Sequence, residues 1–206
     1  MPQTIGLAAN GIACQRGERL LFEEVSFDLR SGEGLLLTGP NGSGKTSLIR
    51  QIAGLLPLAA GTLSATGADD VPLPELCHYV GHLNAVKSSL SVADNLAFWA
   101  EYLGGERAPL TNALAAFGLG PLADFQTGLL SAGQKRKLAL SRLFAAQRPI
   151  WLLDEPQVSL DQASLTLLDG AISAHLAQGG VAVVASHTPL KTKFAHKLSL
   201  GGARAR

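Results

Sequence analysis

The stretch GPNGSGKT, residues 39–46, stands between a short apolar run, LLLT at 35–38, and apolar residues that recur at helical spacing. Its fixed positions match the Walker A pattern and are filled by Gly39, Gly44, Lys45 and Thr46. A match carries weight only when a strand precedes it and a helix follows it, and both conditions hold here. The stretch therefore predicts a phosphate-binding loop at the end of a buried strand.

The residue types in this loop suit phosphate chemistry. Glycines let successive backbone N–H groups turn toward phosphate oxygens, and the helix that begins after them points its positive end at the same place. Lys45 would reach the β- and γ-phosphates, and the Thr46 hydroxyl would bind Mg²⁺. Before nucleotide arrives, we expect the Lys45 ammonium to be solvated. The predicted nucleotide-binding residues are Gly39, Pro40, Asn41, Gly42, Ser43, Gly44, Lys45, Thr46 and Ser47.

A second apolar run, IWLL at 150–153, ends in two adjacent acids, Asp154 and Glu155. Two carboxylates at the tip of a buried strand are unfavourable unless a positive group meets them. Mg²⁺ would be that group at Asp154, and Glu155 would polarise the attacking water. A strand that simply ends in solvated acids is the alternative, and the upstream Walker A pattern disfavours it.

The remaining pattern is that of an α/β protein. Residues 20–29 suggest a strand of a small antiparallel sheet, VAVVAS at 181–186 a further buried strand, and residues 163–178 a helix. Residues 68–91 are irregular, the segment from Val92 to about Ala146 is mostly helical, and the last six residues, GGARAR, suggest disorder. We expect a single domain over 1–206, with a core of about 1–80 and 147–206 and a helical lobe of about 85–146.

Composition excludes several classes of protein. The 206 residues are 47% hydrophobic, yet no stretch approaches the roughly 18 apolar residues of a membrane span. A net charge of +1 gives no electrostatic basis for binding nucleic acid. Cys14 and Cys77 are isolated, which favours a reduced, cytoplasmic setting and buried thiols.

Two further features, a helix start and a histidine, can each be explained without a function. LSAGQ at 130–134 begins a helix, and Ser131 with Gln134 fits a capping box that needs no function. His187 follows the strand at 181–186, at the carboxyl end where ligands of parallel sheets bind. A lone histidine at such a place is more often structural than functional.

These motifs in this order resemble the ATPase subunits of ABC transporters, over nearly the whole chain. LSAGQ is similar to the family signature, IWLLDEP at 150–156 to its Walker B motif, SLD at 159–161 to its D-loop, and His187 to its switch histidine. The resemblance implies a P-loop NTPase with a RecA-like parallel sheet, an N-terminal antiparallel β lobe and an inserted helical lobe. It also implies ATP and Mg²⁺ as cofactors, and Glu155 and His187 as the catalytic residues.

The resemblance gives LSAGQ a purpose as well. In the family, two copies pack head to tail, and the signature helix of each caps the γ-phosphate held by the other. Ser131, Ala132, Gly133 and Gln134 would then bind ATP in trans, and Asp161 would serve as the D-loop acid. Small residues at 132 and 133 would let the backbone approach phosphate closely. The capping box is compatible with this role.

Two positions depart from the family pattern. Where the family has an aromatic residue that stacks on adenine, this chain has Arg16, whose guanidinium plane can also stack on a base. Where the family has the Q-loop glutamine, this chain has His82, which can orient water or Mg²⁺ but also titrates. The expected metal-site residues are therefore Thr46, Asp154 and His82.

Within the family, the chain most resembles the ATPase subunit of the haem exporter of bacterial cytochrome c maturation, through GH at 81–82, Lys87 and the alanine in LSAGQ. This likeness implies a peripheral protein on the cytoplasmic face of the inner membrane, polytopic membrane partners and, indirectly, a periplasmic haem chaperone. Either haem export or release of a chaperone complex fits. An ABC exporter of another substrate, a soluble ABC ATPase and a P-loop kinase stay open as alternatives.

Overall fold

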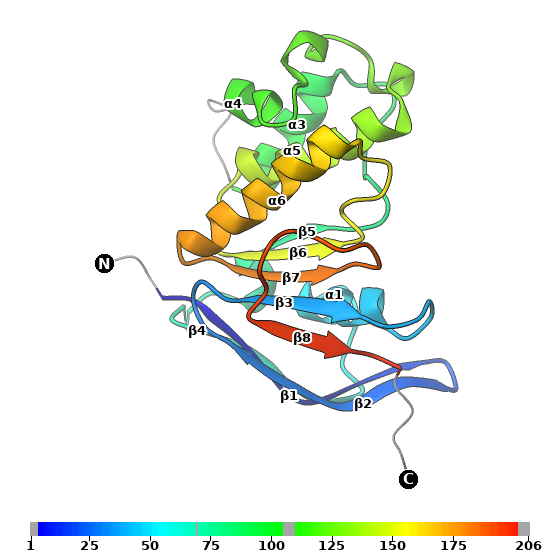
Figure 1. Cartoon of the computed structure of the whole chain (residues 1–206), viewed down its shortest axis with the longest axis vertical. Helices are drawn as coiled ribbons and strands as arrows, with labels where there is room; N and C mark the ends of the chain where they lie inside the picture. The colour runs from blue at the N-terminus through cyan, green and yellow to red at the C-terminus, as the bar shows by residue number, and fades with distance from the viewer. Residues whose placement is uncertain (1–3, 69, 105–109, 202–206) are drawn as a thin grey trace.

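Two β-sheets and a group of helices make up the described part of the chain in the computed structural model, which comprises residues 4–68, 70–104 and 110–201 (Figure 1). The strands are β1 Gly6–Arg16, β2 Arg19–Leu29, β3 Gly34–Thr38, β4 Ala60–Thr66, β5 Cys77–Val80, β6 Ile150–Asp154, β7 Val181–Ala185 and β8 His196–Ser199. The helices are α1 Lys45–Ile52, α2 Leu73–Leu76, α3 Val92–Tyr102, α4 Leu110–Ala115, α5 Ala132–Ala145 and α6 Gln162–Ala177, with short 3₁₀ turns at Gly120–Leu122 and Thr127–Leu129. Of the last six residues, 201–206, for which disorder is expected, 202–206 lie outside the described residues. None of the described helices is long and apolar enough to span a bilayer.

The larger sheet is parallel, with strand order β5-β6-β7-β3-β8. Its central strands are apolar on both faces because both faces are covered. Ile150 and Leu152 of β6 pack into the core shared with β1 and α1, whereas Trp151 and Leu153 pack into a core shared with α5 and α6. This arrangement confirms the predicted α/β P-loop fold.

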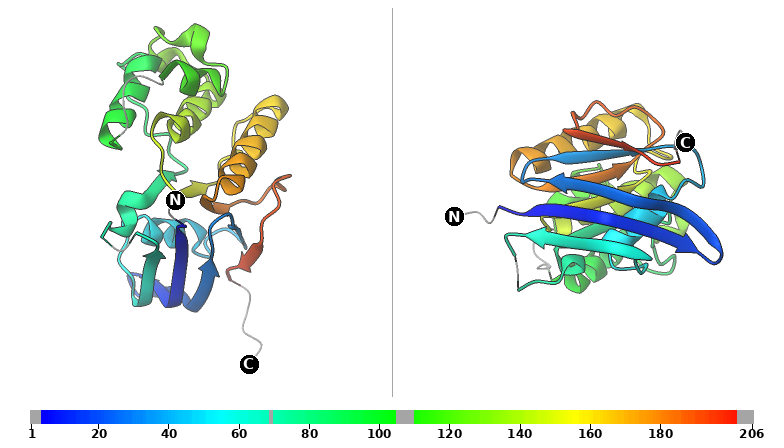
Figure 2. Two further views of the ribbon diagram at one scale, coloured as in Figure 1. Left: turned by 90° about the vertical axis from the view of Figure 1, so that its left-hand side faces the viewer. Right: turned by 90° about the horizontal axis from the view of Figure 1, so that it is seen from below.

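The smaller sheet is antiparallel, with strand order β2-β1-β4. It covers the side of the parallel sheet opposite to α6, as the view from below shows in blue and cyan (Figure 2). Helix α1 supplies Leu48, Ile49 and Ile52 to the core between the two sheets, and all three are fully buried. The antiparallel sheet expected near the N-terminus is thus present, and β4 completes it.

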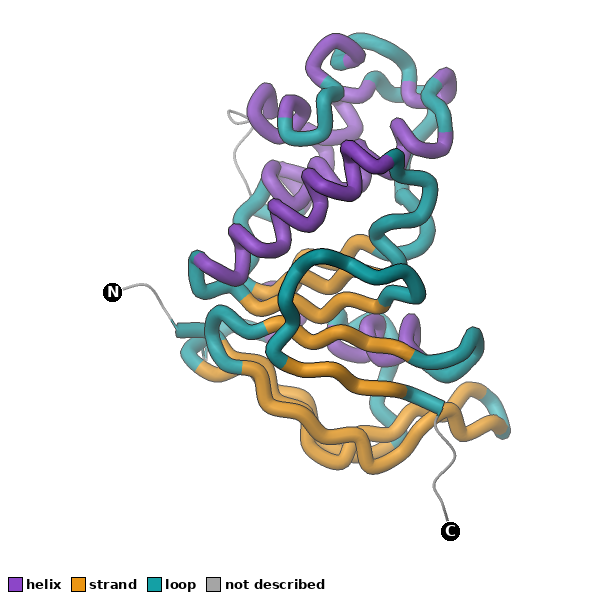
Figure 3. The backbone as a smooth tube through the Cα atoms, viewed as in Figure 1, coloured by secondary structure: helices purple, strands orange, loops and turns teal. Residues whose placement is uncertain are grey.

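The helices α3 and α4 lie at one end of the molecule, away from the strands, and α5 runs from there toward the parallel sheet (Figure 3). They have a core of their own, to which α3 contributes Val92 and Leu96. Helix α5 belongs to two cores, because Leu138 packs with α3 whereas Leu140 packs against the parallel sheet. The helix that carries the signature motif therefore joins the helical end to the sheet.

The interpretation of 68–91 as irregular is wrong for its middle part. This segment contains helix α2 and strand β5, and β5 pairs with β6 at the edge of the parallel sheet. The strand was hard to predict because it has only four residues, CHYV, and His78 and Tyr79 interrupt its apolar pattern. Its importance is positional, because the chain leaves β5 directly into the loop that carries His82.

Candidate nucleotide-binding and catalytic site

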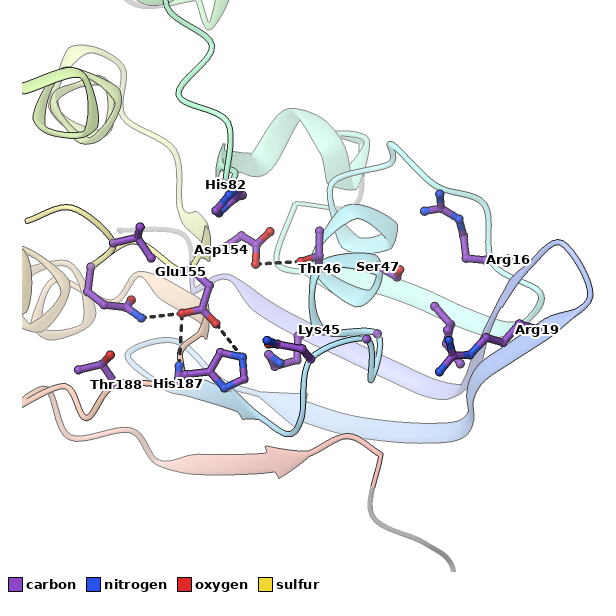
Figure 4. Close-up of a pocket in the computed structure, with 16 residues that line it drawn as sticks. Arg16, Arg19, Lys45, Thr46, Ser47, His82, Asp154, Glu155, His187 and Thr188 are labelled. Atoms are coloured by element: carbon purple, nitrogen blue, oxygen red, sulfur yellow. Dashed lines mark hydrogen bonds and ion pairs between the residues drawn. The ribbon is translucent and has the colours of Figure 1, made fainter. Parts of the chain in front are cut away.

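The loop between β3 and α1 forms one wall of a cavity at the carboxyl ends of the parallel strands (Figure 4). Gly39 and Gly44 have φ angles of 132° and 103°, a region that favours glycine. A Cβ atom on Gly39 would collide with the Leu200 carbonyl oxygen, and one on Gly44 would lie 2.7 Å from the Phe22 ring. The loop can take this path only with glycine at these two positions.

Helix α1 begins with its backbone donors available to a ligand. Its N-cap is Gly44, no side chain caps it, and no acidic residue lies in its first turn. The first N–H groups of a helix have no intrahelical partner and carry partial positive charge. The helix start is therefore suited to an anion such as phosphate.

Lys45 departs from the expectation of a solvated ammonium. Its side chain is buried, and its Nζ donates hydrogen bonds to the carbonyl oxygens of Gly39, at 2.8 Å, and Pro40, at 3.1 Å. The loop curls around the ammonium, and both carbonyls that bind it belong to the loop itself. An ammonium has three N–H donors, and these two bonds use two of them.

Thr46 and Asp154 meet across the cavity, and the Thr46 hydroxyl donates to Asp154 Oδ1 at 3.1 Å. Asp154 is only 1% exposed, and its Oδ2 has no hydrogen-bond partner in the described structure. Burial raises the pKa of this carboxyl, whereas the hydrogen bond from Thr46 opposes that rise. An orphaned carboxylate oxygen beside a hydroxyl fits Mg²⁺, which prefers hard oxygen ligands.

No group of three or more His, Cys, Asp or Glu side chains in the described ranges could hold a metal ion by itself. Mg²⁺ in phosphate-binding sites is usually bound through one or two carboxylates plus phosphate oxygens and water. His82 is exposed, lines the same cavity and lies close enough to Asp154 for its charge to lower the pKa of that carboxyl. The structure thus brings Thr46, Asp154 and His82 to one place.

Glu155 and His187 lie side by side at the ends of β6 and β7 (Figure 4). The His187 backbone N–H donates to Glu155 Oε2 at 3.3 Å, and His187 Nε2 lies 3.4 Å from Glu155 Oε1. Glu155 has a φ of 47°, an unfavourable value for a non-glycine residue that recurs at functional sites. Sequence position alone left open whether His187 is functional or structural. Its contacts with Glu155 favour a functional role.

The cavity has a volume of about 700 Å³, within the range of small-molecule sites. Arg16 lines its outer end together with Arg19, which pairs with it across the β1–β2 hairpin. Arg19 escaped sequence reasoning because only the hairpin register sets it opposite Arg16. Gln157 also lines the cavity and was not predicted.

The signature residues lie outside this cavity. Ser131 is the N-cap of α5, and both halves of the predicted capping box are formed: Ser131 Oγ accepts from Gln134 N, and Gln134 Oε1 accepts from Ser131 N. Ser131 and Ala132 are exposed, so the helix start is open to the surroundings. A Cβ on Gly133 would lie 2.7 Å from the Ser159 carbonyl oxygen, so close packing within this chain also favours glycine at position 133.

Asp161 links the D-loop to the signature helix. It is the N-cap of α6, where its Oδ1 accepts from Ser164 N at 2.7 Å, and its Oδ2 accepts from Lys137 Nζ of α5 at 3.1 Å. Hydrogen bonds from Ser164, aided by Lys137, lower the pKa of this carboxyl to about 2. Asp161 is therefore ionised at neutral pH.

Arg136, which sequence reasoning missed, connects the parts of the site. It lies one turn into α5, is 3% exposed, and burial lowers its pKa. Its guanidinium makes five hydrogen bonds, to the carbonyl oxygens of Gly81, Asp154, Glu155 and Pro156 and to Asn84 Oδ1. The signature helix, the acid pair and the loop around His82 thus share one buried cation.

The fold and the phosphate loop define a P-loop nucleoside triphosphatase. The model of the ABC transporter family matches residues 22–158. Two relatives described as cytochrome c biogenesis ATP-binding export protein CcmA come from Nitrobacter winogradskyi, 46% identical over 96% of this chain and 98% of its own, and Bradyrhizobium diazoefficiens, 47% identical over 95% and 98%. The chain belongs to the ABC transporter family, and within it to these CcmA cytochrome c biogenesis proteins.

Solved structures agree on the fold. A putative ABC transporter ATP-binding protein from Pyrococcus furiosus superposes with a TM-score of 0.81 at 23% identity, covering 95% of this chain and 97% of its own. An ATP-binding subunit of an ABC transporter gives a TM-score of 0.79 at 24% identity, covering 88% and 79%. At these identities the likeness concerns the architecture alone.

Proposed function

We propose that this chain is the ATP-hydrolysing subunit of an ABC exporter that works in cytochrome c biogenesis. The observation that carries the proposal is the cavity in which the phosphate loop faces the acid pair, in a chain nearly half identical to CcmA proteins over almost its whole length. The proposed nucleotide is ATP with Mg²⁺. The work done with it is export of haem, or release of a haem-bearing chaperone complex.

ATP would lie with its phosphates on the uncapped start of α1 and its base toward Arg16. Lys45 would give up carbonyl partners in its own loop to bind the β- and γ-phosphates, an exchange of neutral acceptors for charged ones. Thr46 and Asp154 would hold Mg²⁺, which would neutralise developing phosphate charge. His82 stands next to them, where its ring can orient a water molecule.

Hydrolysis would use Glu155 as the general base. Water loses a proton to the Glu155 carboxylate while its oxygen bonds to the γ-phosphorus. The bond between that phosphorus and the bridging oxygen breaks, and ADP leaves with the electron pair. His187 contacts both carboxylate oxygens and would keep Glu155 turned toward the water.

Two copies would share each nucleotide. The signature residues do not reach their own cavity, yet Ser131 begins a helix whose start is exposed. A second copy packed head to tail would supply this helix start to the γ-phosphate, and Ser131 would donate a hydrogen bond to it. Asp161, held to the signature helix through Lys137, would lie at the same interface.

Membrane subunits would be the other partners. Leu83, beside His82, is 77% exposed, and Phe98 and Tyr102 of α3 are 54% and 70% exposed. Large apolar side chains at the surface support a partner that covers them. We propose that polytopic subunits hold the chain at the cytoplasmic face of the inner membrane, and that a periplasmic haem chaperone receives the product.

Complementation tests this function. In a bacterium lacking the gene, the chain should restore covalent haem attachment to c-type cytochromes, while b-type cytochromes form with or without it. Glu155→Gln should fail to restore attachment, because an amide cannot accept the proton. Glu75→Gln, an exposed glutamate on α2 remote from the cavity, is the matched control and should restore it. Normal haem staining of c-type cytochromes in the deletion strain would contradict the proposal.

A further inference from the structure

Gln157 lies two residues after Glu155, in the loop between β6 and α6. The loop turns tightly, because the Val158 N–H donates to the Glu155 carbonyl and the Leu160 N–H to the Gln157 carbonyl, at 3.3 and 3.2 Å. This turn, together with the positive φ of Glu155, carries the Gln157 side chain back toward the cavity, where it is only 7% exposed. A polar side chain is thus buried next to the proposed general base.

The amide of Gln157 holds the Glu155 carboxylate. Its Nε2 donates to Glu155 Oε2 at 2.6 Å, a short distance for a nitrogen donor. The amide turns its N–H rather than its oxygen to this acceptor, since only the nitrogen of an amide side chain can donate. His187 N is the second donor to Oε2, at 3.3 Å. One oxygen is therefore occupied by two donors.

The other oxygen is less engaged. Glu155 Oε1 is buried and has no hydrogen bond in the described structure, and His187 Nε2 lies 3.4 Å from it. With Oε2 held in place, Oε1 is the atom able to accept a proton from water. The Gln157 contact thereby decides which carboxylate oxygen acts.

The contact leaves the other polar atom of the Gln157 amide, its oxygen, without a hydrogen bond. Its Oε1 is buried and has no hydrogen-bond partner among the described residues. A buried acceptor without a partner destabilises the fold, whereas a leucine or methionine would fill the same space without that loss. The orientation of the amide thus serves the carboxylate of Glu155 rather than the packing of the loop.

We propose that Gln157 is a positioning residue for hydrolysis: its amide N–H holds Glu155 Oε2, and the unpaired Oε1 is left to accept the proton from the attacking water. The inference rests on the proposed function, because it assigns Gln157 a role only if Glu155 is the base. It names a residue that acts through Glu155 and does not itself touch the phosphates.

The test compares Gln157→Met with the parent in the full-length chain, with ATP and Mg²⁺ and a phosphate-release assay. Methionine keeps the length and volume of the side chain but cannot donate. We expect kcat to fall about tenfold or more, as for a misaligned reacting group, while KM for ATP stays within about twofold. Gln178→Met, an exposed glutamine at the end of α6, is the control and should match the parent.

A double-mutant cycle separates positioning from a structural effect. If Gln157 acts through Glu155, Gln157→Met should not lower the residual rate of Glu155→Gln any further. A loss that multiplies with that of Glu155→Gln would overturn the proposal, because it would indicate general damage to the fold. If Gln157→Met does not fold, Gln157→Leu is measured under the same criteria.

The outcomes distinguish the two proposals. A parental rate in Gln157→Met together with an inactive Glu155→Gln overturns the role of Gln157 and leaves the proposed function standing. A parental rate in Glu155→Gln overturns the proposed function itself, and with it the role of Gln157. A lower kcat, an unchanged KM and no further loss in the double variant support the inference.

Discussion

Replacing His78 with leucine should make the protein less sensitive to acid. His78 lies in the middle of β5 and is 1% exposed. Burial lowers the pKa of its imidazole from the ordinary value of 6.5 to about 3, and the positive charges of Arg142 and Arg148 add to this effect. The folded protein therefore keeps His78 neutral over a pH range in which the unfolded chain would protonate it.

The sign and size of the effect follow from proton linkage. Because the folded pKa is the lower one, the unfolded state binds more protons between pH 6.5 and 3, and stability falls as the pH drops through that window. At pH 5 the solution is about 1.5 pH units below the pKa of the imidazole in the unfolded chain, so the folded state loses about 2 kcal/mol of stability. For a domain of this size, about 2 kcal/mol lowers Tm by about 4–8 °C.

Thermal or urea unfolding of parent and His78→Leu, measured from pH 9 to pH 5, tests the reasoning. Plotted against pH, the free energies of unfolding of the two proteins should run parallel above pH 7.5 and diverge below pH 6.5. At pH 5 the variant should retain about 2 kcal/mol of stability that the parent loses. Other titrating groups are the same in both proteins and cancel in the difference. Parallel curves down to pH 5 would show that His78 is not held neutral and would refute the argument.

Two further predictions concern the nucleotide site. Glu155→Gln should run as a dimer with ATP and Mg²⁺ and as a monomer without them; adding Ser131→Arg should restore the monomer, because a bulky side chain keeps the helix start from phosphate. Ser173→Arg, on the exposed side of α6, is the control. If light scattering shows that Glu155→Gln dimerises equally with and without Ser131→Arg, Ser131 is only a helix cap. Lys45→Ala should lower the hydrolysis rate by about 10²–10³-fold, because it removes charge that stabilises the transition state. A folded Lys45→Ala that releases phosphate at the parental rate would contradict that role.

The parallel sheet could largely be predicted from the sequence, and the antiparallel sheet only in part. β3, β6 and β7 are short continuous apolar runs, a pattern that buried parallel strands impose. β1 gave no such signal, because its sequence, GLAANGIACQR, is rich in small residues and its register shifts at several points along the strand. β8 is short, with mostly exposed side chains, and only its pairing with β3 defines it.

The candidate site also contains residues that could be predicted from the sequence and residues that could not. Fixed spacing indicated the phosphate loop and the acid pair, and the resemblance indicated the signature residues and His187. Arg136 and Gln157 could not be predicted, because their contacts depend on a turn with positive φ at Glu155 and on the packing of α5 against the sheet. The expectation for Lys45 was wrong because spacing does not reveal that the loop carbonyls bind the free ammonium.

The buried guanidinium of Arg136 limits how far this ATPase can be treated as interchangeable modules. Its hydrogen bonds run from the signature helix to the backbone at residues 81 and 154–156 and to the side chain of Asn84. A chimera that takes its helical end from another transporter would place a foreign side chain against these carbonyls, and each buried carbonyl left unpaired would destabilise the protein by about 1–3 kcal/mol. Four of the five acceptors are backbone carbonyls that any residue would supply, so an exchange that keeps the enzyme intact must keep the arginine at position 136.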